Sequence, residues 1–173
     1  GLLHVLRLMG ADIEASNAGE QGGEPVADLR VRHAPLRGIE VPEIHVPDMI
    51  DEFPALFVAA ACADGPTRVT GAAELRVKES DRIAVMATGL RMLGIAIDEA
   101  PDGATIPGSP GAGAVFGDGE VESHGDHRIA MAFAVAAQRA AGEVVICDTA
   151  NVATSFPGFV PLARGAGFGL QGD

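Results

Sequence analysis

The sequence predicts an α/β (α+β) domain in which helices and strands alternate along the whole chain. Two observations carry this prediction. Apolar stretches with helical periodicity recur, and several of them end at a glycine that is followed directly by a strand-like segment. The 173 residues are enough for one domain with a sizeable core, and we expect 1–173 to form a single domain.

Periodicity and punctuation place the elements of the first half of the chain. Helical spacing predicts helices at 2–9, 51–63 and 78–93, and the middle one is supported by Pro54, which is tolerated in a first turn. Runs of alternating or β-branched residues predict strands at 11–15, 26–32, 67–70 and 95–99. A polar, Gly-rich turn is expected at 17–24.

The second half is predicted in the same way. Glycine and proline are frequent in 101–119, which we expect to form turns or a hairpin. Helices are predicted at 127–140 and 155–164, and strands at 144–147 and 168–170.

Internal repeats make this order more specific. An arginine, two further residues and a glycine recur at Gly10, Gly94 and Gly167, and each glycine is expected to close a helix in the left-handed conformation before a strand. A second repeat places Asp51 and Arg128 each 14 positions before a glycine that follows a helix. We therefore expect these two residues at the starts of equivalent helices that face one region.

Charge and composition exclude several classes of partner. A net charge of −12 would repel nucleic acid and anionic membranes, so neither is expected as a partner. No apolar run is long enough to span a bilayer. Cys62 and Cys147 lie in apolar sequence and indicate buried thiols of a reducing compartment, as in a cytoplasmic protein, and a disulfide between them is the alternative that the sequence leaves open. The chain begins within a helical pattern, which suggests a fragment of a longer protein.

The densest charged cluster occupies 76–82, with the sequence Arg-Val-Lys-Glu-Ser-Asp-Arg. As a structural feature, it is typical of a solvated helix start with ion pairs along one face. As a functional feature, Lys78 and Arg82 beside Glu79 would combine anion binding with proton transfer. Helical spacing would place these three side chains on one face.

Two further clusters carry candidate chemistry. Asp51 begins a predicted helix, where it is either a cap or a base toward a substrate hydroxyl. In 122–128, Asp126 is expected to cap a helix and Arg128 to clamp an oxyanion through its planar fork. A metal site at His124, Asp126 and His127 has too few ligands, and a serine triad through Ser80 lacks the required strand–turn–helix motif.

Three segments together resemble the 5-enolpyruvylshikimate-3-phosphate synthase family. They are Ile-Asp-Glu-Phe-Pro at 50–54, Glu-Leu-Arg-Val-Lys-Glu-Ser-Asp-Arg at 74–82 and Asp-His-Arg-Ile-Ala-Met at 126–131, and the segment 151–157 is similar to the family's closing motif. The resemblance implies an enolpyruvyl-transferase fold of two domains. Each domain consists of repeated βαβαββ units with helices packed inside and sheets outside. This chain would be most of the C-terminal domain, without the N-terminal one.

The resemblance also implies a reaction. It is the transfer of the enolpyruvyl group from phosphoenolpyruvate to the 5-hydroxyl of shikimate 3-phosphate, with release of phosphate and no cofactor or metal. Position by position, Asp51 matches a substrate-binding proton acceptor, Lys78 a contact to shikimate 3-phosphate, and Glu79 a carboxylate that moves the proton at the methylene carbon. Arg82 and Arg128 match residues that hold phosphoenolpyruvate, and His127 a supporting residue.

Two alternatives remain open at this point. One is a non-catalytic domain of the same fold that binds a phosphorylated ligand or a partner. The other is the related UDP-N-acetylglucosamine enolpyruvyl transferase, which lacks the 76–82 string and the Asp-His-Arg motif. Most substrate contacts from the N-terminal domain would be absent, so we expect the 173 residues alone to be inactive.

Overall fold

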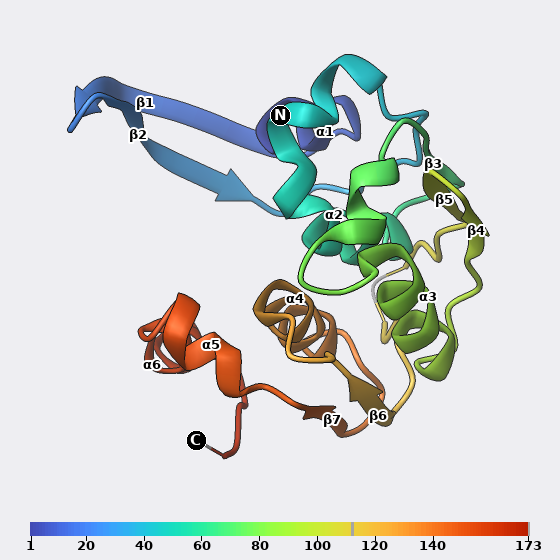
Figure 1. Ribbon diagram of the computed structural model, residues 1–173. Helices are drawn as coiled ribbons and strands as arrows, with labels where there is room; N and C mark the ends of the chain where they lie inside the picture. Colours follow the sequence, from blue (N-terminus) through green and yellow to red (C-terminus); the bar gives the residue numbers. More distant parts are fainter. Residues whose placement is uncertain (112, 173) are drawn as a thin grey trace.

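The computed structural model describes residues 1–111 and 113–172, and shows helices with small sheets around them and a two-stranded arm that projects to one side (Figure 1). The helices are α1 (Leu2–Leu8), α2 (Phe53–Ala61), α3 (Arg82–Met92), α4 (His127–Ala137), α5 (Ala150–Ser155) and α6 (Phe159–Gly165). The strands are β1 (Asp12–Gln21), β2 (Glu24–Arg32), β3 (Thr67–Val69), β4 (Asp98–Ala100), β5 (Gly103–Ile106), β6 (Gly119–Glu122) and β7 (Val144–Cys147). Short 3-10 helices occupy Glu43–His45 (η1), Pro47–Glu52 (η2) and Ala73–Val77 (η3).

The core is built from three helices that pack on one another. Helix α2 contacts both α3 and α4, and its side chains Phe53, Leu56 and Phe57 are fully buried. Helices α3 and α4 approach closely at Gly89, where a Cβ atom would overlap the ring of Phe133. The sheets lie outside these helices (Figure 1), as the predicted architecture requires.

The predicted repeat is present as two parallel strand–helix–strand units. The segment before α2 runs parallel to β3 through the bridges Arg37↔Asp64 and Glu40↔Arg68. In the same way β6, before α4, runs parallel to β7, with Glu122 opposite Cys147. The far edge of β3 pairs antiparallel with β5 in the order β3-β5-β4. Among the described residues, the far edge of β7 pairs with no strand.

The recurrent glycines close three helices as predicted. Gly10, Gly94 and Gly167 have φ values of 100°, 82° and 96°, which a residue with a Cβ atom adopts only with strain. In each case the next residue's N–H donates back into the helix, as in Ile95 N to Leu90 O at 2.9 Å.

The arginine of this repeat has a structural role that the sequence did not suggest. Its guanidinium donates to the backbone carbonyl six residues later in all three copies, from Arg7 to Ile13, from Arg91 to Ile97 and from Arg164 to Leu170. The arginine therefore joins the helix end to the segment that leaves it.

One helix boundary was predicted wrongly and matters for the site. Helix α3 begins at Arg82 rather than at 78, because the Asp81 side chain accepts the Ala84 N–H and caps the helix there. Lys78 has an extended backbone (φ −78°, ψ −157°), so Lys78 and Glu79 belong to a connecting segment.

The other differences lie where the chain is exposed or tightly turned. Most of the expected turn at 17–24 is strand, and β1 and β2 form a hairpin that turns at Gly22 and Gly23. The region 101–119 contains β5 within a hairpin, as expected, and also the first residue of β6. The last predicted helix, 155–164, is present as α6 from Phe159 onward, α5 before it was not predicted, and 168–170 is not a strand.

Candidate functional site

The candidate site is centred on Asp51, which lies in η2 just before α2. Arg128, in the first turn of α4, reaches it from the neighbouring unit. Its Nη1 donates to the Asp51 carbonyl oxygen at 3.2 Å, and its Nη2 lies 3.6 Å from Asp51 Oδ2. The prediction that Asp51 and Arg128 face one region is confirmed, although Asp51 lies in η2, two residues before α2 begins.

Arg82, the first residue of α3, supplies the second guanidinium of the site. Its side chain is 1% exposed, and it is surrounded by three carboxylates. The Nε atom donates to Asp126 Oδ2 at 2.8 Å, Nη1 to Asp51 Oδ1 at 2.9 Å and Nη2 to Glu79 Oε2 at 2.5 Å. Burial alone would lower the pKa of Arg82, but the hydrogen bond to Asp126 and the neighbouring negative charges outweigh it and raise the pKa.

Asp126 connects the two arginines. It is fully buried, and as the N-cap of α4 its Oδ1 accepts the backbone N–H groups of Arg128 at 3.0 Å and Ile129 at 3.4 Å. Its other oxygen accepts from Ser80 Oγ at 3.1 Å and from Arg82. The sequence identified Asp126 as a cap but gave no sign that it also holds Arg82.

Lys78 and Glu79 complete the cluster from the connecting segment. Lys78 Nζ lies 3.6 Å from Asp51 Oδ1 and 2.5 Å from Glu74 Oε1. The hydrogen bond to Glu74 and the charge of Asp51 raise the pKa of Lys78 despite some desolvation. Glu79 contacts Arg82, as predicted from their i,i+3 spacing, although Glu79 lies outside helix α3.

The electrostatics of Asp51 reflect its three basic neighbours. Partial burial would raise its pKa, but the hydrogen bond from Arg82 and the charges of Arg128 and Lys78 prevail and lower it. The side chains of Asp51 and Glu79 are 42% and 51% exposed, so the cluster is open to solvent on this side. His127 is half-buried at the start of α4, and no hydrogen bond joins its side chain to another described residue.

The alternative sites weighed from the sequence do not form in the described part of the chain. His124, Asp126 and His127 do not converge on one point. Ser80 donates to Asp126 rather than to a histidine, so no serine triad is assembled there.

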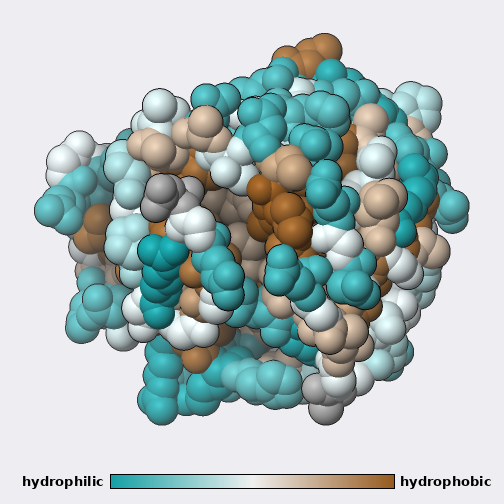
Figure 2. Space-filling model, turned by 90° about the horizontal axis from the view of Figure 1, so that it is seen from below, coloured by the Kyte–Doolittle hydropathy of each residue, from teal (hydrophilic) through white to brown (hydrophobic). Residues whose placement is uncertain are grey.

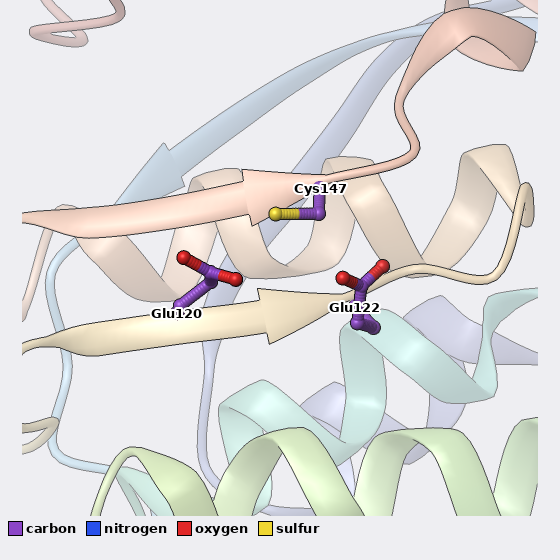
Figure 3. Close-up of side chains that lie close together, drawn as sticks. All are labelled: Glu120, Glu122 and Cys147. Atoms are coloured by element: carbon purple, nitrogen blue, oxygen red, sulfur yellow. The ribbon is translucent and has the colours of Figure 1, made fainter.

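A different group of side chains, of types that can bind metal ions, lies on the outer face of the β6–β7 sheet. Figure 3 shows Glu120, Glu122 and Cys147 side by side, with their donor atoms within 4.8 Å of one another. Desolvation and the two carboxylates raise the pKa of the Cys147 thiol, which disfavours the thiolate. Both cysteines are free and half-buried, rather than buried as predicted.

A groove of about 730 Å³ lies away from the candidate site around Asp51, Arg82 and Arg128. It is formed by α4, β7, α5, α6 and the described C-terminal residues, and none of the six predicted site residues lines it. Figure 2, which views the molecule from below, shows apolar surface beside a hollow on this side. Its walls are mainly aliphatic and aromatic, including Val144, Ile146, Phe159 and Val160.

Comparison with known protein families identifies one family that matches most of the chain. The family described as EPSP synthase (3-phosphoshikimate 1-carboxyvinyltransferase) matches residues 1–162. The chain belongs to the EPSP synthase family.

Curated members of this family are closely similar to the chain. The 3-phosphoshikimate 1-carboxyvinyltransferase of Xanthomonas euvesicatoria is 70% identical over 171 residues, which are 99% of this chain and 38% of that protein. The protein of the same name from Xanthomonas campestris pv. campestris is 71% identical over the same shares. The chain thus spans 38% of the length of these EPSP synthase relatives.

Solved structures confirm the fold. An EPSP synthase structure from Acinetobacter baumannii matches with a TM-score of 0.94 and 51% identity, over 96% of this chain and 38% of that one. The enolpyruvyl transferase NikO from Streptomyces tendae matches with a TM-score of 0.62 and 20% identity, over 96% of this chain and 34% of that one, which shows a shared fold. The predicted fold class is therefore confirmed.

No helix among the described residues is both long and apolar enough to cross a membrane.

Proposed function

We propose that this chain supplies part of the active site of a 3-phosphoshikimate 1-carboxyvinyltransferase. In that reaction the enolpyruvyl group passes from phosphoenolpyruvate to the 5-hydroxyl of shikimate 3-phosphate, and phosphate is released. The observation that carries the proposal is the meeting of Arg82, Arg128 and Lys78 at Asp51, from three separate segments. The match of the chain to named members of the family supports the choice of reaction.

The reaction needs this combination of charges. The hydroxyl oxygen of shikimate 3-phosphate bonds to C2 of phosphoenolpyruvate while a proton is added to its methylene carbon. Loss of a proton from that carbon and of phosphate from C2 then restores the double bond. The carbon that is attacked develops positive character between a carboxylate and a phosphate, and Arg82 and Arg128 would fix those oxyanions around it.

The two exposed carboxylates would perform the proton transfers. Asp51 would accept the proton of the attacking hydroxyl, and Glu79 would act at the methylene carbon. Both contact Arg82 through Nη1 and Nη2. A substrate oxyanion that takes these donors would free Asp51 from Arg82, which raises the pKa of Asp51 and makes it a stronger base.

The remaining contacts would orient the substrates. Lys78 would bind shikimate 3-phosphate, and half-buried His127 would support Arg128 from the adjacent position on α4. We assign no cofactor or metal to the reaction. The expected compartment is the cytoplasm, and no nucleic acid or membrane is expected as a partner.

The domain organisation follows from the same relationship. We place residues 1–173 in one domain, most of the C-terminal domain of a two-domain enzyme. The partner would be the rest of the family's chain, including the N-terminal domain. Since the cluster at Asp51 is open on one side, the missing wall of the site would come from that partner. The 173 residues alone should therefore show no turnover.

The test is an assay of phosphate release by the complete protein that contains this chain. We expect release that requires both phosphoenolpyruvate and shikimate 3-phosphate, and none from the purified 173 residues. Arg128→Lys should lower the rate about 100-fold, because a lysine cannot make the two-pronged contact. Arg139→Lys, whose guanidinium donates hydrogen bonds only to the Gly111 and Gly113 carbonyls among the described residues, is the matched control.

The alternative of a non-catalytic phospholigand-binding domain makes a different forecast. The complete protein would then bind shikimate 3-phosphate in a calorimetric titration yet release no phosphate with both substrates present.

A further inference from the structure

The segment that carries Lys78 and Glu79 lacks the support of regular secondary structure. It connects η3, which ends at Val77, to α3, which begins at Arg82. Its side chains must nevertheless stay within reach of Asp51 and Arg82. The structure therefore has to fix this segment by contacts other than backbone hydrogen bonds of a helix.

Arg76 makes several of those contacts, to Asp81 within the segment and to the residues of the β4–β5 hairpin. Its Nη1 donates to both carboxylate oxygens of Asp81, at 3.1 and 3.0 Å, and so joins the two ends of the segment. Its Nη2 donates to the Ala100 carbonyl at 2.6 Å, and Nε to the Pro101 carbonyl at 3.4 Å. Glu99 lies 3.5 Å from Nη1.

The β4–β5 hairpin gives Arg76 a fixed support. Its turn residue Asp102 also accepts the Gly71 N–H through Oδ2 at 2.9 Å and the Ala72 N–H through its carbonyl at 2.7 Å. The hairpin thus holds the chain just before η3, and through Arg76 it holds the chain just after. Ser80, bonded to Asp126, fixes the segment on its inner side.

We infer that Arg76 is a positioning residue, which with Asp81 and the β4–β5 turn sets where Lys78 and Glu79 stand in the active site. This inference rests on the proposed function. Among its described contacts, Arg76 does not touch Asp51, Arg82 or Arg128, so it acts through the segment it holds. Its ion pairs are partly exposed and contribute little to stability. A displacement of about 1 Å at a reacting group, in contrast, can cost up to roughly 100-fold in rate.

The chain offers a matched control in Arg91. Its Nη1 binds the same Glu99 at 2.8 Å, and its Nη2 donates to the Ile97 carbonyl at 2.8 Å. Arg91 therefore shares the carboxylate and a carbonyl contact near the same hairpin, but it has no described contact with 78–81. A purely structural role for Arg76 would make the two variants behave alike.

The experiment compares Arg76→Met, Arg76→Lys and Arg91→Met in the complete protein. We expect Arg76→Met to lower kcat at least tenfold at saturating substrates and to raise the KM for shikimate 3-phosphate, while its Tm falls no further than that of Arg91→Met. Arg91→Met should keep kcat within about threefold of wild type. Arg76→Lys should be intermediate, because its single ammonium can pair with Asp81 but cannot also reach both carbonyls.

A second measurement does not depend on turnover. Hydrogen exchange should be faster at the amides of 78–81 in Arg76→Met than in Arg91→Met or wild type. If wild type releases no phosphate, the proposed function fails while the exchange result still tests the positioning role. If wild type is active and Arg76→Met matches Arg91→Met in kcat and exchange, the inference is wrong. Should Arg76→Met not fold, equal kcat for Arg76→Lys and wild type would overturn it.

Discussion

The Arg82 side chain is buried, yet two of its three carboxylate partners are exposed to solvent. On its inner side, Nε is held by Asp126, which no solvent reaches. On its outer side, Nη1 and Nη2 meet Asp51 and Glu79, which are half exposed. A buried guanidinium needs a permanent counter-charge, whereas a binding group needs contacts that an incoming anion can replace. Under the proposed function, Asp126 is the permanent counter-charge, and Asp51 and Glu79 are the partners that a substrate anion would replace.

This division predicts unequal costs for removing the carboxylates. Asp126→Ala leaves Arg82 without its buried partner and takes the cap from α4, so it should cost about 3–5 kcal/mol of unfolding free energy. Asp51→Ala removes a solvent-screened partner of the same guanidinium and should cost less than about 1 kcal/mol. Urea unfolding of the complete protein measures both. Equal costs would show that Asp51 and Asp126 do not differ in this way.

The pH dependence of stability gives a second test of Asp51. Its pKa in the folded protein lies below the ordinary value of 3.8. A lowered carboxyl pKa contributes stability that is complete above the unfolded-state value and is lost as the pH falls through the folded-state value. The difference in unfolding free energy between wild type and Asp51→Asn should therefore stay constant from about pH 7 to pH 5 and shrink below about pH 4. A difference that grows on acidification would contradict the direction of the shift.

The sequence predicted much of this cluster and missed one member's role. Asp51 and Arg128 could be brought together because the repeat assigns them equivalent positions before equivalent helices. The pairing of Arg82 with Asp126 spans 44 residues and depends on how α3 and α4 cross, which periodicity does not specify. Short motifs therefore identified the charged residues of the site. The buried contact between Arg82 and Asp126 could be identified only from the three-dimensional structure.

At the scale of elements, the helix ends are the best-defined feature of the chain. Three helices finish on a glycine at positive φ, and each is joined to the following segment by an arginine six residues before the carbonyl it binds. The glycine supplies a backbone conformation, and the arginine supplies a hydrogen bond. Because the role of the glycine is local in sequence, the helix ends could be predicted from a pattern of four residues, whereas the hydrogen bond of the arginine was not predicted.

Two glycines near helix ends should respond oppositely to alanine. Gly94 has φ of 82° and open space where a Cβ atom would stand, so Gly94→Ala should cost about 1–2 kcal/mol through backbone strain alone. Gly165 lies within α6 with equally open space and no positive φ, so Gly165→Ala should be neutral or stabilise by up to about 1 kcal/mol. Thermal unfolding of the complete protein measures the effect of both substitutions. If Gly165→Ala destabilises the protein as much as Gly94→Ala does, backbone strain at Gly94 is not the cause of the destabilisation.

Elements that depend on distant contacts were predicted less well. The start of α3 was placed too early because charged residues at 78–81 fit a helical face, yet Asp81 caps the helix and Arg76 holds the preceding segment outside it. The first strand of the β1–β2 arm was predicted too short, since its exposed, mostly polar residues 16–21 show no apolar alternation to reveal its length.

At the scale of the whole molecule, comparison of the two repeated units shows one sheet edge that is covered in the first unit and uncovered in the second, among the described residues. In the first unit, the far edge of β3 is covered by the β4–β5 hairpin. In the second, the corresponding edge of β7 has no strand beside it in the described chain and borders the apolar groove. Given that the chain is 38% of its relatives' length, we expect another part of the complete protein to cover this groove.

A pair of substitutions on α6 tests that expectation in the complete protein. Val160 lines the groove, whereas Leu162 on the same helix is 63% exposed and does not line it. If the groove is covered, Val160→Glu places a carboxylate in an apolar interface and should cost about 2 kcal/mol or more. Leu162→Glu should change the unfolding free energy by less than about 0.5 kcal/mol, as surface substitutions do. Equal, small effects would mean that the groove stays open to water and that no other part of the complete protein covers it.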